Sequence, residues 1–386
     1  MKRKICIILT TRGNYGKTKN ILKLLNQDKN VELQVVLGGM VVSEKYGRME
    51  YLLEKMDIKV IKKVNFVVEG ESLNSMVKTS GLAILEFGTV FQELNPDLVL
   101  IIADRFECLP MAIAAAYLNI RIAHLEGGEV SGSIDESVRH AITKMAHLHF
   151  PATKEAGERI IKMGEDASNV HVVGGTSMDV LNELNLSDLT EFNEYQKNFG
   201  MGPILYAKKK EYVIVIQHPV TTEYEDNLKH MKATLSAISK LDMNTFWILP
   251  NMDAGSDALN KAIRQYRESN TKKLNIHYFK SLPIEIYGPL LSNSACLIGN
   301  SSSGIRESAF LGVPSVNIGT RQKGRVRAKN VIDVNYDENE ILNAIKKQIL
   351  NKDIQRDFTF GDGSACEKIY NILLSFHSDI QKQITY

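Results

Sequence analysis

The chain has 386 residues, of which 44% are hydrophobic, 24% charged and 7% aromatic, and these proportions exclude a disordered, collagen-like or coiled-coil protein. Its 47 Lys and Arg residues nearly balance its 45 Asp and Glu residues, so there is no overall positive field to attract nucleic acid or an anionic membrane. The length predicts two domains, because single hydrophobic cores stop growing at roughly 250–300 residues.

The N-terminal apolar run Ile5–Leu9 is too short for a signal peptide, and no later run approaches the ~20 residues of a membrane span. The four cysteines, at positions 6, 108, 296 and 366, are scattered and form no Cys-x-x-Cys pair. They are typical of reduced, buried side chains. We therefore expect a cytoplasmic protein with no nucleic-acid partner and no membrane partner.

Short apolar runs alternate with amphipathic segments in the first half of the chain, which predicts βαβ units and a parallel sheet. The predicted strands are almost wholly apolar, as strands covered on both faces should be. They are Ile5–Leu9, Leu33–Leu37, Leu98–Ile102, Ile122–Leu125 and His171–Val173. Helical patterns occupy Thr18–Asn26, Leu73–Leu94, Pro110–Leu118, Ile134–His147 and Lys154–Met163.

The alternation breaks over residues 184–210, which are polar and irregular, and then resumes. The later predicted strands are Tyr212–Ile216, Thr245–Leu249, Ala295–Ile298 and Ser315–Ile318. We divide the chain into an N-terminal Rossmann-like domain (1–183), a C-terminal Rossmann-like domain (184–363) and a terminal segment (364–386) predicted to cross back to the first domain. In such an α/β fold, ligands bind outside the carboxyl ends of the strands.

A serine-rich segment after a predicted strand, Gly299–Glu307, is the strongest candidate for a phosphate site. Small residues let the backbone approach a ligand, and free N–H groups at a helix start attract phosphate. Ser301 and Ser302 would add hydroxyl donors, and Glu307 would accept hydrogen bonds from two ribose hydroxyls. The alternative is structural: the serines cap the helix, and Glu307 only favours the helix dipole.

The first predicted strand runs into a glycine-containing segment, Thr10–Thr18, that superficially matches a P-loop. Only two residues separate Gly13 from Gly16, whereas a P-loop has four, so a P-loop NTPase is disfavoured. We interpret Arg12 as a clamp for a phosphate or carboxylate, because a guanidinium suits bidentate recognition. An ordinary surface arginine is the equal alternative.

Three carboxylates, Asp104, Glu126 and Asp135, follow predicted strands or open a predicted helix. Strand ends of a parallel sheet meet at the ligand crevice, so Asp104 and Glu126 should converge there. Several acids in one water-poor cleft cannot all stay ionised, and the resulting split in pKa supplies an acid and a base. Glu136 fits a capping box with Ser133, which would give it a structural role instead.

Further candidates have weaker local signals. Arg139 lies one helical turn after Asp135, and pairing with that carboxylate would account for it. His218 follows a predicted strand of the second domain and would face the first domain's acids, although a satisfied loop histidine is the alternative. Asn251 lies in a turn-forming segment after the next strand. A His-x-His pair at positions 147 and 149 lacks a convergent third ligand, so we predict no metal site.

Several specific segments occur in order along most of the chain: Ala103–Glu107, His124–Lys144, His218–Glu223, Pro250–Gly255, Gly299–Glu307 and Gly319–Arg325. Together they resemble the hydrolysing UDP-N-acetylglucosamine 2-epimerases of sialic acid biosynthesis. The resemblance implies a GT-B-like α/β fold, in which two Rossmann-type domains enclose a nucleotide-sugar cleft without a cofactor or metal. We also expect a homo-oligomer, either a dimer or a tetramer.

The implied reaction removes the proton at sugar C2 and expels UDP from C1, giving a 2-acetamidoglucal to which water adds to release N-acetylmannosamine. By the family's pattern, Asp104, Glu126 and Asp135 fall on the acid–base carboxylates, and His218 falls beside the diphosphate. The nucleotide-contact positions fall on Arg12, Asn251, Ser301, Ser302, Glu307 and Arg321. Two residues depart from the pattern: Asn14 stands where an acid is usual, and Ala103 stands where glycine is common.

Three alternatives stay open at the level of sequence. A UDP- or GDP-linked 2,4-diacetamido-2,4,6-trideoxy sugar, on the route to legionaminic acid, requires the same C2 chemistry as UDP-N-acetylglucosamine. Non-hydrolysing epimerases share the fold but read Glu-Ala-Gly-Leu-Arg where this chain has Glu126–Val130. A GT-B glycosyltransferase is a more distant alternative, because fold does not fix function.

Overall fold

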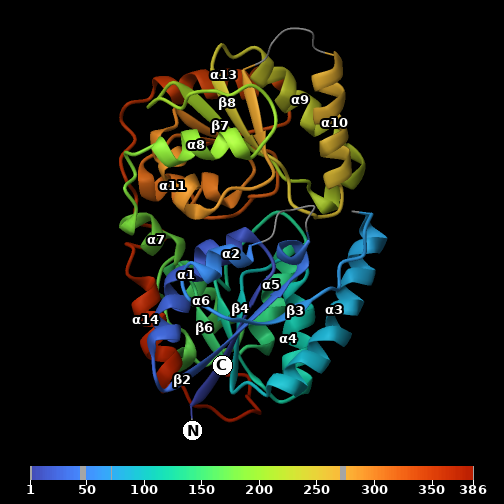
Figure 1. The fold of residues 1–386 in the computed structure, drawn as a ribbon, viewed down its shortest axis with the longest axis vertical. Helices are drawn as coiled ribbons and strands as arrows, with labels where there is room; N and C mark the ends of the chain where they lie inside the picture. The colour runs from blue at the N-terminus through green and yellow to red at the C-terminus, as the bar shows by residue number, and fades with distance from the viewer. Residues whose placement is uncertain (1, 44–48, 71, 270–274, 386) are drawn as a thin grey trace.

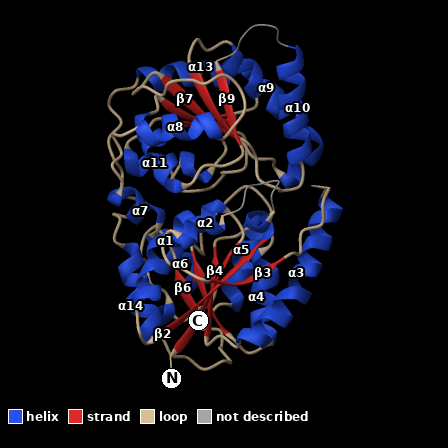
Figure 2. Cartoon of the chain, in the orientation of Figure 1, coloured by secondary structure: helices blue, strands red, loops and turns tan. Residues whose placement is uncertain are grey.

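The computed structural model describes residues 2–43, 49–70, 72–269 and 275–385. Two α/β lobes are stacked along the long axis of the molecule, and each contains one six-stranded parallel sheet (Figure 1, Figure 2). This architecture confirms the predicted α/β fold of two Rossmann-type domains. Within those described ranges, no helix is long and apolar enough to cross a bilayer.

The first-lobe sheet has the strand order β3-β2-β1-β4-β5-β6. The strands are β1 (Arg3–Leu9), β2 (Val31–Gly38), β3 (Val60–Val64), β4 (Leu98–Ile102), β5 (Arg121–Leu125) and β6 (Leu148–Phe150). Side chains of β1 alternate between two cores: Ile5 and Ile7 pack on one face of the sheet, and Cys6 and Ile8 pack on the other. The strand order reverses between β1 and β4, where ligands bind in sheets of this topology.

Helices cover both faces of the first sheet. They are α1 (Arg12–Gln27), α2 (Glu50–Glu54), α3 (Leu73–Leu94), α4 (Cys108–Tyr117), α5 (Asp135–Met145), α6 (Lys154–Lys162) and α7 (Ser177–Glu183). The last helix, α14 (Ala365–Ser375), returns from the second lobe and packs against α1 and α7 (Figure 1). The hydroxyl of Tyr370 on α14 donates to Asp28 at 2.7 Å, at the end of α1.

The second lobe repeats this arrangement, because its sheet order β9-β8-β7-β10-β11-β12 has the same pattern. Its strands are β7 (Tyr212–Ile216), β8 (Asn244–Ile248), β9 (Ile276–Phe279), β10 (Cys296–Gly299), β11 (Ser315–Ile318) and β12 (Val331–Val334). Its helices are α8 (Thr190–Asn198), α9 (Asn227–Ser239), α10 (Ser256–Ser269), α11 (Ile284–Asn293), α12 (Glu307–Leu311) and α13 (Glu338–Leu350).

Three sequence expectations were wrong in detail. The segment His171–Val173 is not a strand; the sixth strand is Leu148–Phe150, and beyond it Val170 makes a single bridge to His149. Residues 184–210 are not irregular throughout, since they contain α8, whose Phe192 is buried in the second lobe. Helix α1 begins at Arg12 rather than at residue 18, because Thr11 caps it.

The two lobes meet in direct contact. Ile284, Ile305 and Phe310 of the second lobe join an apolar cluster of the first lobe. The amide of Gly132 donates to the carbonyl of Arg321 at 3.0 Å, and a Cβ at Gly132 would lie only 1.9 Å from a backbone oxygen of the other lobe. These contacts hold the carboxyl ends of the two sheets toward each other. The domain limits at residues 183 and 363 stay a prediction.

Candidate active site

Two adjoining cavities lie between the lobes. The larger has a volume of about 290 Å³ and is lined from both lobes, and the smaller has a volume of about 40 Å³ and is lined mainly by charged side chains. Their common lining residues are Lys17, Ala103, Asp104, Ser302 and Arg321. The two cavities are therefore adjacent and share these five lining residues.

The structure brings nearly all of the sequence-predicted site residues to these cavities. The larger cavity is lined by Arg12, Asp104, His218, Asn251, Ser301, Ser302, Glu307 and Arg321. The smaller is lined by Asp104, Glu126, Asp135, Arg139, Ser302 and Arg321. Glu136 lines neither cavity but contacts Arg139. Their positions are thus established, while their roles in the reaction stay predictions.

Glu126 follows β5 and is the most tightly held of the three acids. Its backbone has φ +62°, and its side chain is 2% exposed. Arg306 of the second lobe contacts both carboxylate oxygens, with Nη1 at 2.7 Å from Oε2, and Lys17 Nζ lies 2.5 Å from Oε2. Burial raises the pKa of Glu126, but the charges of Arg306 and Lys17 outweigh that effect and lower it to about 2.

Asp104 follows β4 after Ala103, whose φ is +61°. His124 Nε2 lies at hydrogen-bond distance, 2.8 Å, from the Ala103 carbonyl oxygen. Arg139 Nε donates to Asp104 at 2.9 Å, so the sequence-based pairing of Arg139 with Asp135 was wrong. Burial raises the pKa of Asp104, but Arg139 and more distant cations lower it well below its usual range.

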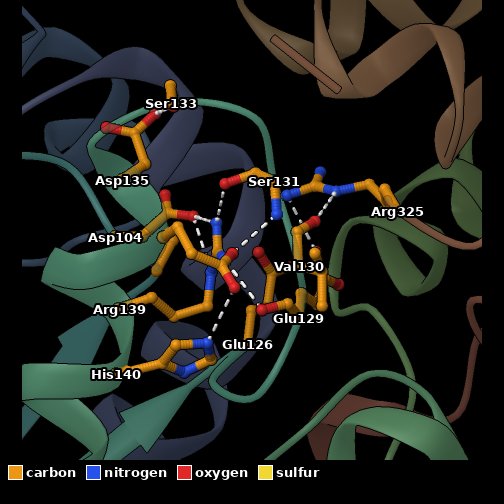
Figure 3. Close-up of polar contacts among 12 residues, drawn as sticks. Asp104, Glu126, Glu129, Val130, Ser131, Ser133, Asp135, Arg139, His140 and Arg325 are labelled. Carbon is orange, nitrogen blue, oxygen red and sulfur yellow. Dashed lines mark hydrogen bonds and ion pairs between the residues drawn. The ribbon is translucent and has the colours of Figure 1, made fainter. Parts of the chain in front are cut away.

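Asp135 opens α5 and differs from the other two acids. Ser133 Oγ donates to its carboxylate at 2.9 Å, and Arg321 Nη2 lies 3.6 Å away (Figure 3 shows Asp135 with Ser133). Burial, followed by the nearby charge of Asp104, raises the pKa of Asp135 to about 6. The site therefore holds two carboxylates that stay ionised and one that changes charge near neutral pH.

Glu136 has a structural task, but not the predicted one. The hydroxyl of Ser133 bonds to Asp135 instead of capping α5, so the capping box with Glu136 was wrong. Glu136 accepts from the Ser131 amide at 2.7 Å and from Arg139 at 3.0 Å. It thereby fixes both the loop before α5 and the arginine that pairs with Asp104.

The serine-rich turn forms the second-lobe wall. Ser301 caps a short 3₁₀ turn (Ser302–Gly304), accepting from the Ser303 amide at 3.3 Å, and α12 begins at Glu307. The structural alternative for Ser301 is therefore present alongside its place in the cleft. Glu307 accepts from Ser177 of the first lobe at 2.6 Å.

Asn300 is a positioning residue that the sequence reasoning missed. Its side chain is fully buried, accepts from the His218 amide at 2.7 Å and donates to the His218 carbonyl at 2.8 Å. The Asn300 carbonyl in turn accepts from Arg321 at 3.1 Å. Burial, followed by the charge of Arg321, lowers the pKa of His218 to about 3, so the imidazole is neutral at physiological pH.

Several charged contacts across the lobes were also missed. Arg105, which follows Asp104, pairs with Glu107 at 2.7 Å and with Asp253 of the second lobe at 3.2 Å. Arg325 of the second lobe pairs with Glu129 of the first at 3.0 Å (Figure 3). Their only sequence signal was position inside the segments quoted above, since local spacing does not show which opposite charge lies across a cleft.

The imidazoles at 147 and 149 do not converge. His147 Nε2 lies 2.9 Å from the Ile380 carbonyl, and His149 Nε2 lies 3.2 Å from Glu165. Over the part of the chain that the structure describes, no three His, Cys, Asp or Glu side chains are grouped so that they could hold a metal ion.

The chain is similar to known proteins along most of its length. Residues 23–374 match the family model described as UDP-N-acetylglucosamine 2-epimerase. The chain is 32% identical over 382 residues to the UDP-N,N'-diacetylbacillosamine 2-epimerase (hydrolyzing) of Legionella pneumophila, with 98% of each chain covered. It is 31% identical over 363 residues to the UDP-N-acetylglucosamine 2-epimerase of Neisseria meningitidis serogroup B, covering 94% and 92% of the two chains.

Solved structures show the same fold. The crystal structure of UDP-GlcNAc 2-epimerase from Neisseria meningitidis bound to UDP-GlcNAc superposes with a TM-score of 0.79 at 18% sequence identity, over 97% of this chain and 100% of that one.

Proposed function

The chain belongs to the UDP-N-acetylglucosamine 2-epimerase family, and from that premise we propose that it is a hydrolysing member, which converts UDP-N-acetylglucosamine and water to N-acetylmannosamine and UDP. The observation that carries the proposal is that Asp104, Glu126 and Asp135 line one cavity together with Ser302 of the opposite lobe. Acid–base groups thus face a turn suited to a diphosphate. The similarity to a relative described as hydrolyzing supports the choice of subtype.

In the proposed first step, a carboxylate takes the proton from C2, and the electrons of that C–H bond form the C1=C2 double bond of a 2-acetamidoglucal. UDP leaves with the electron pair of the C1–O bond. Glu126 and Asp104 are ionised and line the cavity, so both are candidates to accept the proton, although their lowered pKa values make them weaker bases than Asp135. Arg321, His218 and the amides of the serine-rich turn would stabilise the charge that develops on the diphosphate.

In the proposed second step, water adds across the double bond: its oxygen bonds to C1, the proton it loses passes to an ionised carboxylate, and a carboxyl group gives a proton to C2 from the opposite face. Asp135 suits the transfer of that proton to C2, because its pKa of about 6 leaves part of it protonated near neutral pH. The sum of both steps is hydrolysis of the sugar nucleotide with inversion at C2.

The test is incubation with UDP-N-acetylglucosamine in heavy water, followed by measurement of free UDP and of deuterium at C2 of the sugar. We expect free UDP and deuterated N-acetylmannosamine. Recovery of an epimerised sugar nucleotide would instead identify a non-hydrolysing enzyme, and UDP release that depends on an added acceptor would identify a glycosyltransferase.

A second candidate substrate is a UDP- or GDP-linked 2,4-diacetamido-2,4,6-trideoxy sugar. The 32% identity to the Legionella pneumophila relative, over 98% of both chains, favours including it. The same assay compares the two sugars, and the one with the higher kcat/KM is the substrate. We also propose a homo-oligomer, which light scattering of the purified protein measures directly.

A further inference from the structure

A second-lobe arginine holds a first-lobe carboxylate at the centre of the site. We propose that Arg306 is a positioning residue, which fixes the carboxylate of Glu126 in one orientation and keeps it anionic. Because Arg306 belongs to the second lobe and Glu126 to the first, this state of Glu126 depends on contact between the two lobes. The inference rests on the proposed function for its kinetic test. Its second test, on stability, does not depend on any substrate.

The contact geometry leaves Glu126 little freedom. The two terminal nitrogens of Arg306 each contact a different oxygen of Glu126, and the two side chains are 3% and 2% exposed. The backbone of Glu126 is fixed as well, since its amide donates to the Phe150 carbonyl at 2.9 Å. A guanidinium fork that meets both oxygens sets the plane of the carboxylate, which a single ammonium contact does not.

The charge of Glu126 depends on few groups. A carboxylate buried to this extent becomes neutral unless cations compensate for lost hydration. The cations in contact with its oxygens are Arg306 and, from α1, Lys17. The other charged groups around the cavity pair among themselves in the described structure: Asp104 with Arg139, Glu129 with Arg325, and Asp135 with Arg321. Glu129 also lies 3.8 Å from Arg306.

Arg306 is tied to the turn proposed to bind the diphosphate. It follows the 3₁₀ turn directly before α12, and its amide donates to the Ser302 carbonyl at 3.0 Å. Ser302 lines both cavities. The residue that contacts Glu126 is therefore continuous in the chain with the turn that lines both cavities.

The kinetic test compares Arg306→Gln with two matched variants. Arg306→Lys keeps the charge but loses the fork, and Arg325→Gln removes another buried arginine that pairs across the lobes, with Glu129. Arg306 is the cation that lowers the pKa of Glu126 most, so without it we expect burial to outweigh the remaining charge of Lys17, and Glu126 to take up a proton at a higher pH. We expect the kcat/KM deficit of Arg306→Gln to be at least about tenfold larger at pH 5.5 than at pH 8, which requires Glu126 to titrate about one pKa unit above pH 5.5 in the variant, far above its native pKa of about 2. Arg306→Lys should show a smaller pH dependence. Arg325→Gln should also show a smaller one, because Arg325 does not pair with Glu126 and Arg139 remains beside Asp104.

The stability test uses Tm and needs no substrate. In the native chain the pKa of Glu126 is lowered, so its ionisation stabilises the fold above the unfolded pKa of about 4.3. In Arg306→Gln we expect burial to outweigh Lys17 and to raise the pKa of Glu126 above its unfolded value, so that ionisation destabilises the fold as the pH rises. We therefore expect the Tm deficit of Arg306→Gln to be smaller at pH 5 than at pH 8, and this difference to vanish when Glu126→Gln is added.

Two results would overturn the proposal. One is a kcat/KM deficit of Arg306→Gln that grows between pH 8 and pH 5.5 no more than the deficit of Arg325→Gln does. The other is a pH-dependent Tm deficit of Arg306→Gln that persists in the Glu126→Gln background. If the native chain releases nucleotide from none of the sugars, the proposed function fails, and the Tm comparison still decides the role of Arg306.

Discussion

Replacing Asp135 by asparagine should stabilise the fold while removing activity. In the folded chain the pKa of Asp135 is about 6, against about 3.9 in an unfolded chain, because burial and the charge of Asp104 oppose its ionisation. A folded pKa that is raised means that stability falls as the pH rises through the window from about 4 to about 6. Two pKa units correspond to about 2.7 kcal/mol of destabilisation, which is complete by pH 8 and which Asp135→Asn would remove as a gain in stability.

Part of this gain is offset. Asparagine would weaken the contacts of the carboxylate with Ser133 and Arg321, and about a quarter of the Asp135 side chain is exposed, so we subtract about 1 kcal/mol. The net expectation for Asp135→Asn is a free energy of unfolding about 1–2 kcal/mol higher than wild type at pH 8. The gain should be about 1 kcal/mol smaller at pH 5, where the native carboxyl is already largely protonated.

The measurement is urea unfolding at pH 5 and pH 8, with nucleotide release assayed in parallel. Asp253→Asn is the matched control: burial raises the pKa of that carboxyl, but Arg105 and Arg321 outweigh it, so the variant should be less stable than wild type at pH 8. The reasoning is refuted if Asp135→Asn is less stable than wild type at pH 8, or if its stability difference is the same at both pH values.

Three further predictions concern single residues. Glu126→Gln should slow nucleotide release by about 10²–10⁴-fold and lower the free energy of unfolding by about 3 kcal/mol, since Arg306 loses a buried carboxylate; a wild-type rate would remove Glu126 from the mechanism. Asn14→Ala should lower the unfolding free energy by about 1–3 kcal/mol in urea titrations, whereas Asn14→Asp should not, because Asn14 Oδ1 accepts from two buried backbone amides. Ala103→Gly should raise the free energy of unfolding by up to about 1 kcal/mol in urea titrations, since the φ of Ala103 is +61°; a lower free energy of unfolding would show that the alanine methyl group contributes packing.

The central strands were predictable and the edge strands were not. The eight strands inside the two sheets, β1, β2, β4, β5, β7, β8, β10 and β11, were all predicted from apolar runs. The four edge strands, β3, β6, β9 and β12, were missed. They are three to five residues long and mix polar with apolar residues, as in the sequence Val-Ile-Lys-Lys-Val of β3, so they contain no continuous apolar run.

Asn14 illustrates a departure from the family pattern that only coordinates could explain. The resemblance predicted an acid at this position, and its absence left the local hydrogen bonding open. The amide oxygen of Asn14 accepts from the backbone of Thr10 and Thr11 and closes a reciprocal cap on α1. An acceptor is what the position requires, and an uncharged one satisfies it.

By itself, the sequence determined which polar side chains stand at the carboxyl ends of the strands, because hydrophobic periodicity and turn residues act over a few positions. That was enough to bring Asp104, Glu126 and Asp135 to the cleft. Only the tertiary structure decided their partners: Arg139 pairs with Asp104 and not Asp135, and Glu126 is held by an arginine 180 residues away. Since burial and neighbouring charge set a pKa, the charge state of each acid follows from contacts that no local pattern encodes.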